Sequence, residues 1–393
     1  MQRADFADYK NIPLVISLDG GGGEEVAGIA ERFEWHHGEK RIIQHEKHLG
    51  LRHHILFCGD LTQNYGGVII LEDDCFVSRN FYDFAVQTLA CYGDESRIAG
   101  ISLYSHRFNE QASLPFMPLD DGGDVFFMQV PSSHGQIWTR QQWAGFRQYH
   151  DSGPVIRASD ALPLNVPNWP ESSWKKYFYQ YVVERDLFFA YPSISLLTNF
   201  GDAGTHQSQP SQHYQVPIEA RRTHRHLSLV PFNKSCNKYD AFFEIQPQCL
   251  QSYGVDIDPD TCIDLYGTRR IEAARQAYAL SIREVSRPLL SFRADLFPLA
   301  LNLIYPIPGG MIAYGRREHF GALGAGTRWK LMQNIQPLGC NFGMLTARSS
   351  RYYKLGYCLT HPWRIPSMLR PKSERFLETF CAWEGDPSLK GEE

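Results

Sequence analysis

The sequence predicts an α/β fold in which helices cover both faces of a mostly parallel sheet. Over the first half of the chain, short runs rich in apolar and β-branched residues alternate with longer stretches whose apolar residues recur every three or four positions. The first pattern is typical of buried strands and the second of helices that pack on a sheet. The composition agrees, because 43% of the 393 residues are hydrophobic and 21% are charged, which is enough for a sizeable core.

The predicted elements follow one another in a regular order. Strands are predicted at residues 12–18 (IPLVISL), 41–45 (RIIQH), 68–71 (VIIL) and 98–103 (IAGISL), and helices between them at residues 24–33, 51–65 and 80–92. Later helices are predicted at residues 140–149 and 174–184, before a strand-like run at 187–197. We place a domain boundary near Pro217, between a sheet domain (1–216) and a C-terminal extension (217–393) of unknown role that is largely helical or irregular.

Composition and charge argue against several classes of protein. The formal net charge is −4 and no basic run is dense, so a nucleic-acid partner is not expected. The nine cysteines include no C-x-x-C pair, which favours free thiols in a reducing cytoplasm. The chain opens without a signal-peptide pattern, and no apolar run reaches the ~20 residues of a transmembrane helix. The interrupted apolar run at 288–314 leaves open a peripheral contact at the inner membrane, beside a buried role.

Acidic side chains follow two of the predicted strands. Asp19 ends the first strand, and Glu72, Asp73 and Asp74 end the third. Because ligands bind at the carboxyl ends of parallel strands, both groups are expected to face one cleft. Adjacent carboxylates repel one another, and Mg²⁺ or Mn²⁺ relieves this by taking one or two of them together with phosphate oxygens and water. This pattern fits a nucleotide diphosphate held through a metal ion, although a surface acidic loop has the same composition.

Four segments carry a resemblance to a known family. They are VIILEDDCFVSRNFYDF, ISLYS, FFMQVPSSHGQIW and YPSISLLTNFGDAGTH. In order and spacing they resemble the GT-A glycosyltransferases, in particular the N-acetylglucosaminyltransferase I-like group and bacterial family-2-type relatives, and IPLVISLDGGGGEE resembles the second strand and loop of that family. The resemblance covers residues 10–215. It implies a Rossmann-like sheet and an inverting transfer of a hexosyl or N-acetylhexosaminyl group, in polysaccharide biosynthesis, from a nucleotide-diphosphate donor to a glycan or lipid-linked acceptor.

The resemblance also implies roles for individual residues. Those at donor-contacting positions are Asp19, Glu72, Asp73, His134 and Gly135. Asp74 stands at the position of the metal-binding aspartate, and His206 stands where a late histidine completes the metal site in some members, with Mn²⁺ or Mg²⁺ as the ion. From the residues alone, Asp19 also fits a turn, and His134 and His206 also fit ordinary structural roles.

The sequence departs from the family where the general base is expected. The family carries a Trp-Asp-Asp stretch, but Lys175 and Lys176 follow Trp174 here. A lysine accepts a proton near neutral pH only if its pKa falls by several units. Glu171 and Asp202 are the predicted substitutes, ahead of Asp160 and Glu184. The two lysines could instead hold a phosphate or lie on a solvated helix face.

A second departure concerns the start of the fold. The first predicted strand matches the second strand of the family, so we expect the first strand–helix unit to be missing and a sheet edge to be left unpaired. These departures keep two alternatives open. One is a degenerate, non-catalytic module that binds nucleotide sugars or glycans, and the other is a metal-dependent phosphohydrolase that uses the acidic strand end.

Overall fold

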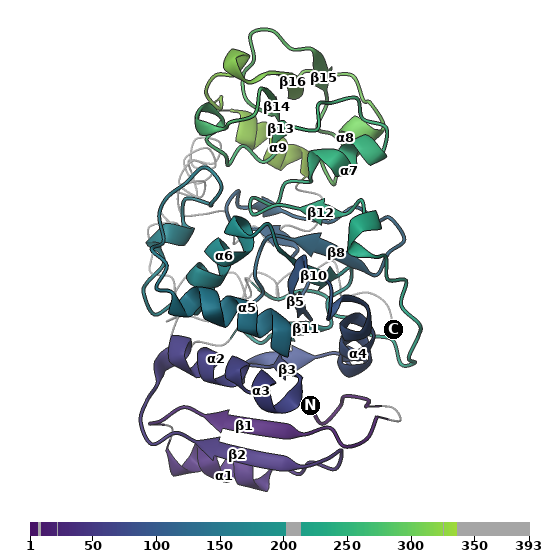
Figure 1. The fold of residues 1–393 in the computed structure, drawn as a ribbon. Coiled ribbons are helices and arrows are strands. Elements are labelled where there is room, and N and C mark those ends of the chain that lie inside the picture. The colour runs from purple at the N-terminus through teal and green to yellow at the C-terminus, as the bar shows by residue number, and fades with distance from the viewer. Residues whose placement is uncertain (7–8, 22, 202–213, 325, 336–393) are drawn as a thin grey trace, which may run out of the picture. The chain divides into compact units, whose positions relative to one another are not determined.

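The computed structural model describes residues 1–6, 9–21, 23–201, 214–324 and 326–335 (Figure 1). Contacts divide the chain into the units Met1–Gly339 and Cys340–Glu393, and every described residue belongs to the first unit. Within the described residues, no helix is both long enough and apolar enough to cross a bilayer.

A six-stranded sheet forms the centre of the fold. Its strand order is β12 (Lys238–Tyr239), β8 (Val125–Met128), β10 (Phe188–Pro192), β5 (Ile98–Ser102), β9 (Gln136–Thr139) and β3 (Gly67–Ile70). The pairs β12–β8 and β10–β5 are parallel, and the other three pairs are antiparallel. The predicted α/β class is confirmed, with a sheet of mixed direction. β12 lies beyond the predicted boundary at Pro217 and still joins this sheet.

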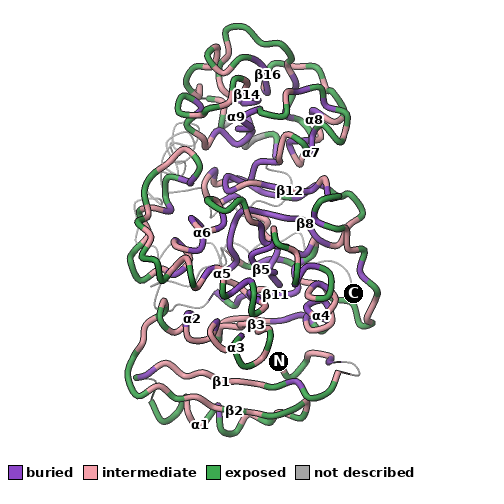
Figure 2. Tube along the Cα trace, viewed as in Figure 1, coloured by how far each residue is buried: buried purple, intermediate pink, exposed green. Residues whose placement is uncertain are grey.

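Side chains of the central strands alternate between two apolar cores, one on each face of the sheet. In β10, Phe189 and Tyr191 pack into the core that α5 (Arg140–Asp151) and α6 (Trp174–Glu184) cover. Phe188 and Ala190 pack into the other, which α4 (Phe81–Tyr92) covers. Burial on both faces explains why these strands are almost continuously hydrophobic, and Figure 2 shows β5 and β8 as buried.

The N-terminal strands form a separate, more exposed pair. β1 (Leu14–Leu18) runs parallel to β2 (Lys40–Gln44), with α1 (Glu24–Arg32) between them in sequence. Every residue of β1 and of β3 is only partly buried. In the described part of the chain, β1 pairs only with β2, and β3 only with β9. Each of the two strands therefore keeps one edge without a strand partner, and such edges are open to pairing.

A second sheet lies beyond the predicted boundary. Its order is β13 (Thr261–Asp264), β14 (Tyr278–Ser281), β16 (Ile312–Arg316) and β15 (Leu290–Phe292), and the nearby helices are α7 (Pro247–Ser252), α8 (Leu301–Ile304) and α9 (Thr327–Ile335). The sequence prediction for this region contained no sheet. These strands have three to five residues each. Such short strands show little of the alternation between apolar and polar residues by which a strand is predicted from sequence.

Candidate functional site

The carboxyl ends of three strands meet at one edge of the six-stranded sheet. β3, β5 and β10 run in one direction, because β9 is antiparallel to both β3 and β5 and because β10 is parallel to β5. Gln136, which opens β9, lies opposite Ile70 at the end of β3 and opposite Ser102 at the end of β5. The segments that follow these strands therefore gather at this edge, where ligands bind in open α/β sheets.

The acidic strand end, which comprises Glu72, Asp73 and Asp74 after β3, lies at this edge. Glu72 and Asp74 are half-buried and Asp73 is exposed. Burial, together with the charges of Asp74 and Asp73, raises the pKa of Glu72 to about 7, and the charge of Lys175 opposes this shift. The backbone carbonyl of Asp74 accepts a hydrogen bond from the Phe200 amide at 3.0 Å, which fixes the turn against the end of β11 (Leu197–Asn199). Burial and the neighbouring acidic charges therefore both disfavour the charged form of Glu72.

Two histidines with depressed pKa values lie within reach of the Lys175 charge, which also acts on Glu72. The His134 ring lies between Tyr104 and Tyr214, with centroid distances of 5.1 and 5.4 Å. The His106 ring packs near Tyr104, at 5.3 Å, and its Nε2 atom is buried without a hydrogen-bond partner. Burial and the charge of Lys175 lower the pKa of His134 to about 4 and that of His106 well below its usual value. Both rings are therefore neutral at pH 7 and can hydrogen-bond a hydroxyl group.

Lys175 supplies positive charge to the same site. It lies in the first turn of α6, is half-buried, and has its Nζ 5.8 Å from the centre of the Trp169 ring. Burial lowers the pKa of Lys175, and the charges of Glu110 and Glu72 raise it. Lys176 behaves differently: its side chain is buried, and its Nζ donates to the carbonyl of Trp169 at 2.9 Å and to Glu171. A solvated helix face does not describe Lys176.

Two neighbours on α6 bind the carboxylate of Glu171. Its carboxylate is exposed and accepts hydrogen bonds from Lys176 and from the Tyr177 hydroxyl, while Arg52 bonds to its backbone carbonyl at 2.7 Å. The hydrogen bonds from Lys176 and Tyr177 lower the pKa of Glu171. A carboxylate held in its charged form accepts protons weakly, so this geometry does not favour the predicted base role. The other predicted base, Asp202, and the predicted metal ligand His206 lie outside the described residues.

Asp19 caps a helix. Its carboxylate accepts hydrogen bonds from the amides of Leu49, Gly50 and Gly20 at 2.6, 3.0 and 2.8 Å, at the start of α2 (Gly50–Asp60), and pairs with His48 at 2.9 Å. Burial raises its pKa, but these bonds outweigh burial and hold the pKa of Asp19 below its usual value. No hydrogen bond or ion pair joins Asp19 to the acids after β3 within the described residues, and β1 belongs to another sheet.

Gly135 shapes the turn that carries His134. Its φ of +64° is a conformation that favours glycine, and a Cβ atom there would lie 2.7 Å from Leu197 and 2.9 Å from Leu103. Besides the predicted contact with the donor, Gly135 has a steric role, because a side chain would collide with these two leucines. Trp138, at the end of the same segment, is fully buried in the core.

The acidic strand end provides a donor set that suits a hard divalent cation. Among the described residues, no group of three or more His, Cys, Asp or Glu side chains is arranged to hold a metal ion. Mg²⁺ and Mn²⁺ sites need only one or two carboxylates when phosphate oxygens and water complete the coordination. Asp74 and Glu72 can supply these, and the raised pKa of Glu72 identifies the charge that a cation would neutralise. The residues present therefore fit such an ion bound together with a phosphorylated ligand.

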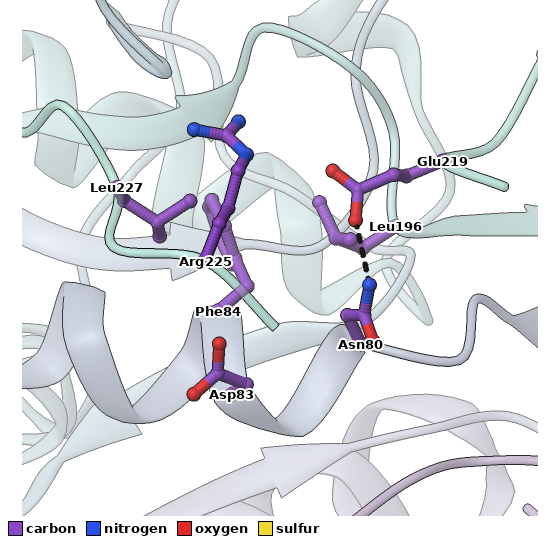
Figure 3. Close-up of a pocket in the computed structure, with 7 residues that line it drawn as sticks. All are labelled: Asn80, Asp83, Phe84, Leu196, Glu219, Arg225 and Leu227. Atoms are coloured by element: carbon purple, nitrogen blue, oxygen red, sulfur yellow. Dashed lines mark hydrogen bonds between the residues drawn. The ribbon is translucent and has the colours of Figure 1, made fainter. Parts of the chain in front are cut away.

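A small cavity elsewhere is not suited to a substrate. It has a volume of about 10 Å³ and lies between α4 and the segment that carries Glu219 and Arg225 (Figure 3). Asn80 donates a hydrogen bond to Glu219 at 3.0 Å across it. This space is about that of one water molecule, so the cavity belongs to the packing of this segment on α4.

The raised pKa of Glu72 predicts that the stability of the folded state changes with pH. Because its folded pKa is raised, the folded state binds more protons than the unfolded state between pH 4.5 and about 7, and the free energy of unfolding falls as pH rises through this window. Without added metal, Glu72→Gln should increase the free energy of unfolding by about 1–3 kcal/mol at pH 8 and leave it unchanged near pH 4. His134 produces the opposite slope in both proteins, so the difference between their urea denaturation curves isolates Glu72. A variant no more stable than the wild type at pH 8 would contradict this.

Sequence reasoning missed His106 and Glu110. Both lie in the irregular segment after β5 and have no motif around them. Their place after a central strand could have identified them as candidates, because residues that follow such a strand lie at the carboxyl edge of the sheet. Comparisons of the chain with protein-family models and with curated proteins find no match.

Proposed function

We propose that this chain is a glycosyltransferase that moves a sugar from a nucleotide-diphosphate donor to a hydroxyl group of a glycan or lipid-linked acceptor. One observation carries the proposal: the charge of one lysine, Lys175, acts both on the half-buried Glu72 at the carboxyl edge of the sheet and on the two neutral histidines, His106 and His134. Carboxylates and neutral imidazoles bind hydroxyl groups, and excess negative charge draws in a cation. A sugar linked to a diphosphate combines both requirements in one ligand.

Asp74, with Glu72 beside it, would hold the Mn²⁺ or Mg²⁺ ion. When bound, such an ion neutralises the charge of a leaving diphosphate. The chain itself orients the donor: the turn at Asp73 and Asp74 is fixed by the Phe200 hydrogen bond, and Gly135 sets the approach of His134. Aromatic rings complete the surroundings, since the His134 ring is flanked by Tyr104 and Tyr214. The half-buried Tyr214 ring, rather than the buried Tyr104 ring, would suit the C–H face of a sugar.

A second function is favoured by a specific observation. Glu171, the predicted base, is exposed and hydrogen-bonded by Lys176 and Tyr177. A site without a base would bind nucleotide sugars without transferring them. Release of nucleoside diphosphate separates the two functions, because only a transferase breaks the bond between the sugar and the diphosphate.

Thermal unfolding in the presence of nucleotide sugars tests the proposal. A ligand that binds only the folded state stabilises it by about 2.7 kcal/mol when present at 100 times its Kd. We expect at least one member of a panel of UDP- and GDP-sugars to raise the Tm in the presence of 1 mM Mn²⁺ and to raise it less in EDTA. A Tm that no member of the panel changes would contradict both the catalytic and the binding function.

A further inference from the structure

Glu110 lies in a loop that is fastened to the face of α6 that carries Lys175. The loop joins the short strands β6 (Phe108–Asn109) and β7 (Leu114–Pro115). Gln111, the next residue, donates hydrogen bonds to the carbonyl of Ala241 at 2.8 Å and to the Tyr179 hydroxyl at 3.5 Å. Tyr179 stands four residues after Lys175, so the two share one face of the helix. These contacts bring the Glu110 loop to the lysine at the start of α6.

Glu110 and Lys175 influence each other without touching. Both are half-buried. Within the described part of the chain, neither the carboxylate nor the ammonium group takes part in a hydrogen bond or an ion pair, and the Lys175 ammonium contacts only the Trp169 ring. The charge of Glu110 nevertheless acts, after burial, on the pKa values of Lys175, Tyr104 and Tyr214. Two opposite charges that act on each other without a hydrogen bond or an ion pair leave room for a polar group of a ligand between them.

The other carboxylates of this region have hydrogen-bond partners or are assigned to other roles. Glu171 is held by Lys176 and Tyr177, and Asp240 is paired with Arg269. Glu244 is fully buried, accepts a hydrogen bond from the Tyr266 amide at 2.8 Å, and has a pKa that burial raises well above the usual value. Asp19 caps α2. Glu72 belongs to the acidic strand end that we assign to the donor. Apart from the acids that follow β3, Glu110 is therefore the carboxylate near Lys175 that no described residue holds.

We propose that Glu110 is the general base that accepts the proton of the attacking hydroxyl group, and that Lys175 is a positioning residue for the same hydroxyl. This inference rests on the proposed function and assigns the base role to Glu110 in place of the predicted Glu171. In the step, the hydroxyl proton moves to the Glu110 carboxylate as the hydroxyl oxygen bonds to C1 of the donor sugar. The bond from C1 to the phosphate oxygen breaks, and its electron pair leaves with the nucleoside diphosphate. Water can replace the acceptor, and the product is then the free sugar.

Hydrolysis of UDP- and GDP-sugars tests this assignment without a known acceptor. We expect Glu110→Gln to lower the rate of nucleoside diphosphate release at least 100-fold, which is within the usual contribution of a general base. The donor-dependent rise in Tm should stay as in the wild type, because the donor is held elsewhere. Glu110→Asp should recover part of the rate. Lys175→Met should lower the rate of release and leave the donor-dependent rise in Tm as in the wild type, because the lysine positions the attacking hydroxyl group rather than the donor. Lys175→Arg should recover part of the rate.

Glu31→Gln is the matched control, because Glu31 is an exposed residue of α1 and lies outside the site. It should leave the rate of release unchanged. Release by Glu110→Gln at the wild-type rate would overturn the assignment and leave the proposed function standing. Loss of the donor-dependent Tm rise in parallel with the rate would also overturn it, since Glu110 would then serve binding or folding. A wild-type protein that neither binds nor hydrolyses any donor would instead contradict the proposed function.

Discussion

Asp74→Ala is expected to abolish the part of the donor-induced Tm rise that depends on Mn²⁺. Asp74 is half-buried in the turn after β3, and the Phe200 amide binds its backbone carbonyl. The substitution removes one carboxylate and leaves that backbone hydrogen bond in place. If Asp74 is the main protein ligand of the cation, the diphosphate loses its bridge to the protein. At a donor concentration about 100 times the Kd of the wild type, the lost stabilisation of the folded state is about 2.7 kcal/mol.

The measurement is thermal unfolding of wild type and variant with a UDP- or GDP-sugar, in Mn²⁺ and in EDTA. Asp94→Ala controls for the loss of an acidic side chain, because Asp94 is exposed and lies after α4. The control should behave as the wild type in both conditions. If Asp74→Ala keeps the full Mn²⁺-dependent rise, the assignment of the cation to this turn is wrong.

Trp138→Ala is expected to lower the free energy of unfolding by about 3–5 kcal/mol, as large-to-small changes of buried aromatic residues do. Trp138 is fully buried, and its ring lies 4.7 Å from Trp143, 5.7 Å from Trp174 and 5.6 Å from Phe178. Its Nε1 has no hydrogen-bond partner, so packing is what the substitution removes.

Urea denaturation monitored by circular dichroism measures this loss, and donor binding by the protein that remains folded separates packing from function. We expect the folded variant to keep its donor-dependent Tm rise, because the Trp138 ring packs in the core between the sheet and the helices α5 and α6. A stable variant that has lost donor binding would contradict this and show that the indole contributes to the donor site.

Much of the first half of the fold follows from periodicity. The strands predicted at 68–71 and 98–103 are β3 (Gly67–Ile70) and β5 (Ile98–Ser102), and the helices predicted at 80–92 and 174–184 are α4 and α6. The helix predicted at 51–65 is divided into α2 and α3 (Thr62–Tyr65). Apolar runs buried on two faces and helices with one apolar face are strong patterns, because packing on the sheet fixes them.

The remaining parts depend on contacts between distant segments. Strand direction could not be predicted, because β8 and β9 are short runs that fit either direction until their neighbours are known. The acids after β3 could be placed at the carboxyl edge from the sequence. Glu110 could not be placed, since its loop is tied to α6 through the hydrogen bond between Gln111 and Tyr179, two residues distant in sequence. His106 could not be placed because it lies in the irregular segment before β6. The local sequence of Glu171 gave no sign that Lys176 and Tyr177 would bind its carboxylate.

Anomalous diffraction from a crystal grown with Mn²⁺ and either UDP or GDP tests the central claim most directly. The account predicts an anomalous peak beside the carboxylate of Asp74, with the diphosphate oxygens on the other side of the ion and Lys175 facing the same space. A peak at another position, or a nucleotide bound away from the carboxyl edge of β3, would contradict the account.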